Sequence, residues 1–263
     1  MDLGLKDKVV IVAASSAGLG KASALAFAKE GAKVIISGRD VDRLQQAKED
    51  IDKAAATDVM AVQMDVTNAK DIESLVESVV QNYGTIDVLI NNAGGPPPGY
   101  FWDIEDDEWQ RAYELTVMSS VRMTKKVLPL MRKQQWGRIV NIASNTVKQP
   151  IDQLLLSNSL RLAVIGWAKT LSNQVASEGI TINNACPGWT RTERVSGLMQ
   201  AKAEMNKTSA EEELEAVANS IPARRLGNPE EFADLIVFLA SDRASYITGT
   251  SIQIDGGTSA GFY

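Results

Sequence analysis

The fold of this chain is decided near its beginning by residues 8–20, which read KVVIVAASSAGLG. The β-branched run predicts a buried strand over Lys8–Ala14, and the small residues after it predict a tight turn that leads into a helix. Such a junction points free backbone N–H groups and the positive end of the helix dipole at one spot, which suits a pyrophosphate. The segment therefore predicts a dinucleotide site, and its expected contacts are Ser15, Ser16, Gly18, Leu19 and Gly20.

The rest of the chain repeats this alternation of apolar runs and longer amphipathic stretches. The runs are rich in Val and Ile, which is typical of strands buried on both faces. The predicted strands are Lys8–Ala14, Lys33–Gly38, Val59–Asp65, Ile86–Asn91, Gly137–Ala143, Ile180–Cys186 and Ser251–Asp255. Helices are expected near 18–30, 41–55, 69–82, 105–133, 158–178 and 229–241. The alternation predicts an α/β fold, with a seven-stranded parallel sheet and helices on both faces.

We expect a single doubly wound, Rossmann-like domain over residues 1–263, because no repeat, linker or low-complexity tract divides the chain. Its one long irregular stretch runs from about 188 to 225 and is expected to contain helical pieces of its own. A connection of that length in a compact domain is usually functional, so the stretch is predicted to be a lid over the substrate.

Composition excludes several kinds of chemistry. The 263 residues include no histidine and one cysteine, Cys186. A Ser-His-Asp or Cys-His nucleophile needs an imidazole base, and a zinc site needs several His or Cys ligands, so no metal is expected. No disulfide can form within the chain, which favours a cytoplasmic location. Cys186 ends a predicted buried strand and is interpreted as a small core residue.

Charge and hydropathy restrict the partners. The formal net charge is −6, and the basic residues form no long stripe, which argues against nucleic acid. Short basic clusters at 125–126 and 132–138 are interpreted as solvated helix ends, with docking of an acidic carrier as the alternative. No segment resembles a membrane span or a signal peptide. A small-molecule substrate in the cytoplasm is expected.

The end of the second predicted strand indicates which nucleotide is bound. Folds that bind NAD place an acid there for the ribose, whereas NADP binders place a base for the 2′-phosphate. Here Gly38 stands where the acid is expected, and Arg39 with Ser37 can bind a phosphate. Asp40 is either a displaced ribose-binding acid or the N-cap of the next helix. The segment favours NADP, with NAD as the alternative.

Further motifs resemble the short-chain dehydrogenase/reductase family over essentially the whole chain. They are NNAG at 91–94, Asp65-Val66, PGWTRT at 187–192, FLAS at 238–241 and DGG at 255–257. The most similar branch holds 3-oxoacyl-carrier-protein reductases. The resemblance implies a homotetramer built through the long helices and the C-terminal strand. It also implies cofactor contacts from Asp65, Val66, Asn92, Ala93, Gly94, Arg161, Pro187, Gly188, Thr190 and Thr192.

The catalytic positions depart from the family pattern, in which a tyrosine follows a serine by thirteen residues and a lysine follows four later. Ser144 fits the serine, but the counted positions hold Ser157 and Arg161. No tyrosine occurs between residues 113 and 246, so a small shift of register supplies none. Glu114 stands where the family has the asparagine of its proton relay.

One more departure lies in the phosphate loop, which begins Thr-Gly in the family and Ala13-Ala14 here. Alanine adds a Cβ where glycine permits a tight turn.

These substitutions weaken the expected acid. A phenol has a pKa of about 10, and a serine hydroxyl is a much weaker acid. Arginine stays charged, so Arg161 is expected to hold the nicotinamide ribose and to stabilise a developing alkoxide. Ser144 and Ser157 are expected to hydrogen-bond the reacting oxygen, and water or Glu114 would supply the proton.

The predicted function is that of an NADP(H)-dependent oxidoreductase acting on a carbonyl or alcohol, with 3-oxoacyl thioesters among the candidate substrates. One alternative is a non-catalytic NAD(P)-binding protein, a sensor or oligomer partner; the other is an enzyme that uses the pocket without net redox chemistry. Three aromatics in the loop at 94–102 and apolar side chains of the lid predict a largely apolar substrate, with a core or interface role as the alternative. The aromatic and lid residues are Tyr100, Phe101, Trp102, Trp189, Val195, Leu198, Met199 and Met205.

Overall fold

Seven parallel strands form one sheet in the order β3-β2-β1-β4-β5-β6-β7, in a computed structural model that describes residues 1–261. The strands are β1 (Val9–Val12), β2 (Lys33–Gly38), β3 (Met60–Gln63), β4 (Val88–Asn91), β5 (Gly137–Ile142), β6 (Ile180–Pro187) and β7 (Ser251–Ile254). The predicted α/β class and parallel sheet are confirmed. The chain order reverses between β1 and β4, which is where open α/β sheets bind their ligands.

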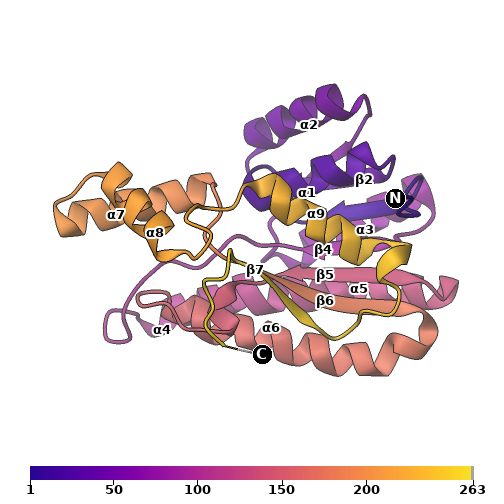
Figure 1. Ribbon diagram of the computed structural model, residues 1–263. Helices are drawn as coiled ribbons and strands as arrows, with labels where there is room; N and C mark the ends of the chain where they lie inside the picture. Colours follow the sequence, from indigo (N-terminus) through magenta and orange to yellow (C-terminus); the bar gives the residue numbers. More distant parts are fainter. Residues whose placement is uncertain (262–263) are drawn as a thin grey trace.

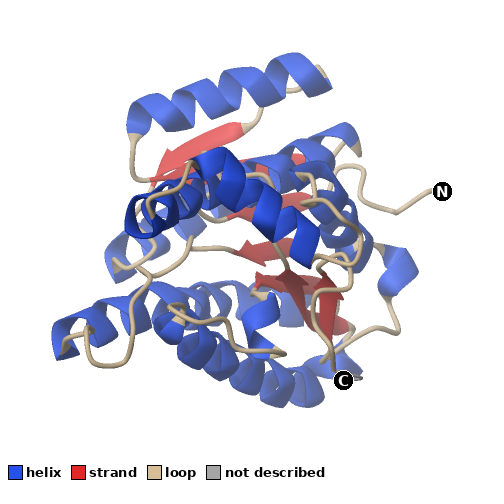
Figure 2. Ribbon diagram, turned by 60° about the vertical axis from the view of Figure 1, so that its left-hand side comes forward, coloured by secondary structure: helices blue, strands red, loops and turns tan. Residues whose placement is uncertain are grey.

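Helices cover both faces of this sheet (Figures 1 and 2). On one face lie α1 (Gly18–Lys29), α2 (Val41–Ala55) and α9 (Pro229–Ala240). On the other lie α3 (Ala69–Tyr83), α5 (Ser119–Gln134) and α6 (Leu155–Val175). None of the helices in residues 1–261 combines the length and the apolar character that crossing a bilayer requires.

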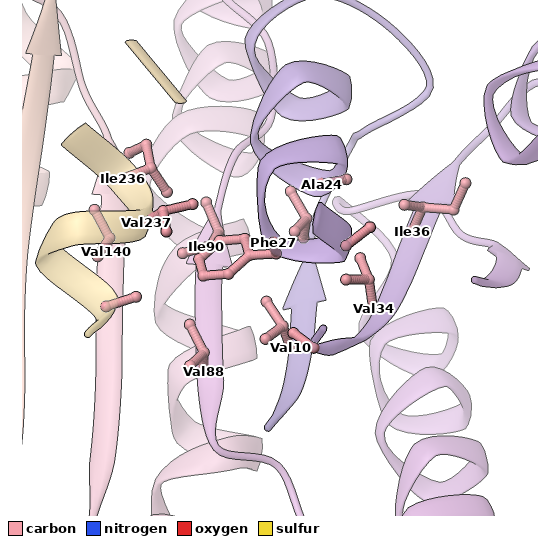
Figure 3. Close-up of a cluster of buried hydrophobic side chains, with 14 of the residues drawn as sticks. Val10, Ala24, Phe27, Val34, Ile36, Val88, Ile90, Val140, Ile236 and Val237 are labelled. Atoms are coloured by element: carbon pink, nitrogen blue, oxygen red, sulfur yellow. The ribbon is translucent and has the colours of Figure 1, made fainter. Parts of the chain in front are cut away.

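The two faces explain why the strands are apolar throughout. In β1, Val10 and Val12 pack under the first helix layer, whereas Val9 and Ile11 pack under the second. Figure 3 shows Phe27 of α1 lying over the central strands beside Ile90. Phe27 has no exposed surface, and burying a side chain of that size stabilises the fold by about 1.5–3 kcal/mol.

Three asparagines form a buried ladder across the middle of the sheet. Asn91, Asn141 and Asn184 stand opposite one another on β4, β5 and β6. Asn91 Nδ2 donates to Asn141 Oδ1 over 2.8 Å, and Asn141 Nδ2 donates to Asn184 Oδ1 over 2.8 Å. Each of the three amides therefore has at least one hydrogen-bond partner within the core.

Among the elements whose bounds differ from the expected ones, two lie beside the carboxyl ends of the central strands. β1 ends at Val12, two residues early, because the chain turns at Ala14 with a φ of 46°. The helix expected over 105–133 is interrupted: α4 (Asp106–Tyr113) runs into a π-helical turn, Glu114–Met118, before α5 begins. π-helical turns of this kind are rare and frequently occur at functional sites.

The stretch at 188–225 contains two helices, α7 (Glu193–Asn206) and α8 (Ala210–Ser220), which project beyond the sheet in Figure 1. We call this stretch the lid segment. Met199, Val217 and Ile221 of this segment form a small apolar cluster with Leu226, which directly follows it. The segment therefore has a core of its own, apart from the two clusters that sandwich the sheet.

Candidate active site

A cavity of about 410 Å³ opens at the carboxyl ends of the central strands. Its walls come from the turn after β1 and from the segments after β2, β3, β4, β5 and β6, together with α6 and α7. The cavity thus lies at the point where the chain order reverses.

The N-terminus of α1 is prepared for an anion. Ala17 is the N-cap residue and offers no side-chain acceptor, and the first turn contains no acid. By contrast, Asp40 caps α2 and Asn68 caps α3 with side-chain hydrogen bonds. The N–H groups of the first turn of α1 therefore remain available, and the helix dipole favours a negative group beside them.

The predicted contacts of this turn divide into two groups. Ser16, Gly18 and Leu19 line the cavity. Ser15 does not, because its buried hydroxyl donates to the Val12 carbonyl over 2.7 Å and accepts from the Ser37 N–H over 3.0 Å. Gly20 does not either.

Gly20 serves close packing. A Cβ at this position would lie 2.8 Å from both the Ala14 carbonyl and Asn92 Nδ2. The amide of Asn92 already donates to that carbonyl over 2.9 Å. The lack of a side chain at Gly20 thus lets α1 pack closely against the turn. The two hydrogen bonds of the buried Ser15 hydroxyl hold the turn in place.

The end of β2 places a cation on the cavity wall and leaves little room for an acid. A Cβ at Gly38 would lie 3.2 Å from the Ser16 side chain, so little room is left for the acid of NAD-binding folds. Arg39 lines the cavity and has no acidic partner within residues 1–261. Asp40 accepts the Arg43 N–H over 3.0 Å and is the N-cap of α2, which decides between the two interpretations of that residue.

Ser37 and Asp65 were predicted to contact the cofactor, and the structure places neither on the cavity wall. Ser37 is fully buried, and its hydroxyl accepts the Ala14 N–H over 3.3 Å. Asp65 accepts the N–H and the hydroxyl of Thr67, each over 2.8 Å. Both side chains hold the backbone near the cavity, whereas Val66 lines it.

Ser144, Ser157 and Arg161 come together on the cavity wall. Ser144 follows β5 and caps a short 3₁₀ turn by accepting the Thr146 N–H over 3.1 Å. Ser157 lies in the first turn of α6, and Arg161 follows one turn later. Arg161 Nε donates to Ser157 Oγ over 3.2 Å, and Thr146 Oγ1 lies 3.4 Å from the same oxygen. The Ser157 hydroxyl thus accepts from a cation.

Arg161 is fixed across two strands. Its Nη1 donates to the Ile142 carbonyl at the end of β5, and its Nη2 donates to the Gly94 carbonyl after β4, each over 2.8 Å. Burial and the charge of Arg194 lower the pKa of Arg161 to about 10, so it remains a cation at neutral pH. Burial also raises the pKa of the Cys186 thiol to about 11, which keeps that thiol protonated.

Glu114, the predicted proton donor, is not among the residues that line the cavity. It begins the π-helical turn, and its Oε2 accepts from Arg122 Nη1 over 2.6 Å in an ion pair. Gln110 donates to the other carboxylate oxygen over 3.4 Å. Both oxygens of the Glu114 carboxylate thus have hydrogen-bond partners on the adjoining helices α4 and α5.

A second cavity of about 20 Å³ lies next to Arg161 and the π-helical turn. Asn91 Oδ1 and Thr116 Oγ1, which have no partner within residues 1–261, belong to residues that line it. A space of this size admits about one water molecule, which would give both oxygens a hydrogen bond.

The remaining predicted cofactor residues all line the main cavity: Asn92, Ala93, Gly94, Pro187, Gly188, Thr190 and Thr192. Arg194, in the first turn of α7, was missed by sequence reasoning. It lines the cavity and donates to the Gly95 and Pro96 carbonyls over 3.0 and 2.9 Å. No motif marks this position, because Arg194 follows the last residue of the PGWTRT motif, Thr192.

The predicted apolar residues also divide. Trp189, Val195 and Leu198 line the cavity. Met199 is buried in the lid segment, and Met205 is exposed. Tyr100, Phe101 and Trp102 lie outside the wall, are exposed, and include a stacked pair, Tyr100 and Trp102, with centroids 5.3 Å apart.

Comparisons with known proteins agree with this geometry. Residues 13–259 match the family profile described as enoyl-(acyl carrier protein) reductase. The 3-oxoacyl-(acyl-carrier-protein) reductase FabG of Thermotoga maritima is 34% identical over 256 residues, which cover 96% of this chain and 98% of that protein. The NADPH-dependent reductase BacG of Bacillus subtilis is 31% identical over 255 residues, which cover 97% and 98%. L-Sorbose reductase from Gluconobacter frateurii, solved with NADPH and L-sorbose, is 33% identical and matches 100% of both chains with a TM-score of 0.95.

Proposed function

This chain belongs to the short-chain dehydrogenase/reductase family, and from that premise we propose that it is an NADP-dependent oxidoreductase acting on a carbonyl or alcohol carbon. The observation that carries the proposal is the single cavity that joins an uncapped helix N-terminus, a free Arg39 and the Ser144–Ser157–Arg161 group. The relatives named above are reductases, and two of them use NADPH by their names. They do not favour a non-catalytic nucleotide-binding protein.

The cofactor fits the residues of this chain. The first turn of α1 would hold the pyrophosphate, and Arg39 would hold the 2′-phosphate. Arg161 and the segments 92–94 and 187–192 would surround the nicotinamide ribose and ring. When bound, NADPH supplies the hydride.

The side chains of this site would act on the substrate oxygen. The Ser157 hydroxyl accepts from Arg161 Nε, so with Thr146 Oγ1 as the donor in their 3.4 Å contact its own proton would point to the substrate oxygen. Ser144 would offer a second hydroxyl by turning its proton away from Asn145 Oδ1, which lies 3.4 Å away. The fixed charge of Arg161 would stabilise the negative charge that develops as hydride reaches the carbon. Since Glu114 is engaged with Arg122, water in the open cavity would supply the proton.

The proposal also covers the oligomeric state of the protein, its cellular location and the role of the lid segment. We expect a cytoplasmic homotetramer, in which the lid segment closes over a small-molecule substrate. The free, buried Cys186 suits a reducing compartment. The separate core of the lid segment would let it move as a unit against the sheet.

Fluorescence titration with NADPH and NADH tests the cofactor. The wild-type protein should bind NADPH more tightly than NADH. Arg39→Gln should weaken NADPH binding about tenfold to a hundredfold and leave NADH unchanged, because it removes a charge-assisted contact to the 2′-phosphate. Asp40→Asn is the matched control: asparagine also caps a helix, so neither affinity should change. A loss of NADH affinity in this variant would mean that Asp40 binds the ribose.

Oxidation of NADPH with ketones, 3-oxoacyl thioesters and sugars tests the reaction. Turnover of at least one class is expected, and tight NADPH binding without turnover would count against an enzyme. The double variant Ser157→Tyr/Arg161→Lys, with the residues that the family pattern has at these positions, is the control. Activity that appears only in this variant would show that the frame is intact and that the native side chains prevent the reaction.

A further inference from the structure

Two guanidinium groups share the part of the cavity that follows β4. Arg161 donates to the carbonyl of Gly94, and Arg194 donates to the next two carbonyls, those of Gly95 and Pro96. Both side chains line the cavity, although they come from different helices, α6 and α7. Two cations are thus anchored side by side on one short segment.

Neither cation has an acidic partner within residues 1–261, where their recorded partners are backbone carbonyls and one hydroxyl. The only acidic side chain on the cavity wall is Glu193, and it pairs with Arg43. Arg194 uses two of its five N–H donors on the carbonyls, so others remain for a ligand. Burial lowers the pKa of Arg161, and the positive charge of Arg194 lowers it further, because the two cations repel each other.

The phosphates of the cofactor do not account for this charge. Arg39 and the uncapped end of α1 serve the 2′-phosphate and the pyrophosphate, and both lie after β1 and β2. Arg161 and Arg194 instead hold the segment after β4, where Ser144 and Ser157 also stand. The uncompensated charge therefore lies at the reacting end of the cavity.

We propose that the substrate is an oxo acid or hydroxy acid, whose carboxylate lies between Arg161 and Arg194 while its carbonyl or hydroxyl oxygen faces the two serines. This inference rests on the proposed function and names its substrate class. Leu154, Trp189 and Leu198 supply apolar wall for the rest of the molecule. The expectation of a largely apolar substrate is thereby narrowed to an apolar body with one anionic end.

Matched pairs of ligands test the proposal: a series of 2-oxo and 3-oxo acids with phenyl or alkyl tails, each beside its methyl ester. Binding to the NADPH-loaded protein is followed by the change in cofactor fluorescence, and turnover by NADPH oxidation. At least one acid should bind about tenfold or more tightly than its ester, because the ester keeps the carbonyl and loses the charge. Equal binding of every pair, or no binding by any acid at millimolar concentration, would overturn the proposal.

Variants assign the effect to Arg194. Arg194→Gln should weaken binding of the preferred acid about tenfold to a hundredfold and leave the ester and NADPH unchanged. Arg194→Lys, which keeps the charge, should recover part of the loss. Arg191→Gln is the charge-matched control, because Arg191 is exposed in the same segment and does not line the cavity. A parallel loss of NADPH and acid binding in Arg194→Gln would place this cation on the cofactor phosphates and refute a substrate role.

The two proposals fail in distinguishable ways. If an acid binds more tightly than its ester but NADPH is never oxidised, the anion site is supported and the oxidoreductase activity is refuted. If acid and ester bind with equal affinity and oxidise NADPH at equal rates, the oxidoreductase activity is supported and the anion site is refuted.

Discussion

Ala14 illustrates how one side chain can strain a binding turn. Its φ of 46° lies in the left-handed region, where a Cβ costs about 1–2 kcal/mol. Ala14→Gly should raise the free energy of unfolding by about 0.5–1 kcal/mol, since relief of strain exceeds the added freedom of the unfolded chain. Urea unfolding measures the change. Ala13→Gly is the control: Ala13 is buried without a positive φ and should lose stability, so equal losses in both variants would contradict strain at Ala14.

The types and spacing of individual side chains predicted some residues of the site and missed others. Ser157 and Arg161 were found by counting from Ser144 along the spacing of the family pattern, and both line the cavity. In the sequence, the hydroxyls of Ser15 and Ser37 look as suitable for a cofactor contact as that of Ser16. Only the structure shows that both are buried and hydrogen-bond the backbone of the turn instead. Arg194 carries no motif, and its place on the wall follows from how the lid segment folds.

The π-helical turn gives Glu114 a structural partner, and this assignment can be tested. Glu114→Gln removes the ion pair with Arg122, which is partly exposed, so the free energy of unfolding should fall by only about 0.5 kcal/mol. Turnover should be unchanged, since Glu114 does not line the cavity. Steady-state kinetics beside urea unfolding measure both. A tenfold or greater loss of turnover at nearly unchanged stability would restore Glu114 as the proton donor.

Within the lid segment, Glu213 predicts how stability depends on pH. Lys202 pairs with its carboxylate, and Asn206 and Thr208 donate to it, which lowers its pKa from 4.5 to about 2. A depressed pKa contributes stability above pH 4.5 that is lost as the pH falls towards 2. The Tm difference between wild type and Glu213→Gln should therefore be steady above about pH 5 and should shrink below pH 4.5.

The exposed Glu215 on the same helix provides the control. Glu215→Gln should leave Tm nearly unchanged across the range. A difference between wild type and Glu213→Gln that stays constant down to pH 3 would mean that the ionised carboxylate contributes nothing.

Elements were predicted well where the period of the sequence is unambiguous. The strands appear near their predicted positions because β-branched runs of this length suit a sheet buried on both faces. The π-helical turn inside the stretch 105–133 was not predicted, because sequence periodicity separates helix from strand and does not separate one kind of helical turn from another. Helical pieces were expected in the lid segment, but their bounds were not predicted, because α7 and α8 pack on each other rather than on the sheet.

For the whole molecule, the proposed homotetramer predicts a particular surface of contact. Leu162 of α6 is 52% exposed, and Ala163 and Gly166 beside it are exposed as well. Light scattering should give four times the 28.4 kDa chain mass, and Leu162→Glu should reduce it to that of a dimer, because a buried unpaired charge opposes helix packing. Met205→Glu, on an exposed residue of α7, should leave the mass unchanged. A monomeric wild type would refute this assembly.

The asparagine ladder is compatible with only one alignment of β4 against β5. Neighbouring side chains on a strand point to opposite faces, so a slip of one residue between β4 and β5 would leave amides unpaired in the core. The same slip would move the Ile142 carbonyl by about 3.3 Å relative to that of Gly94, and Arg161 must hold both. The ladder and Arg161 therefore depend on the same alignment: a sheet slipped by one residue would lose its amide pairs and the two carbonyls that hold Arg161, so only the correct alignment gives a complete site.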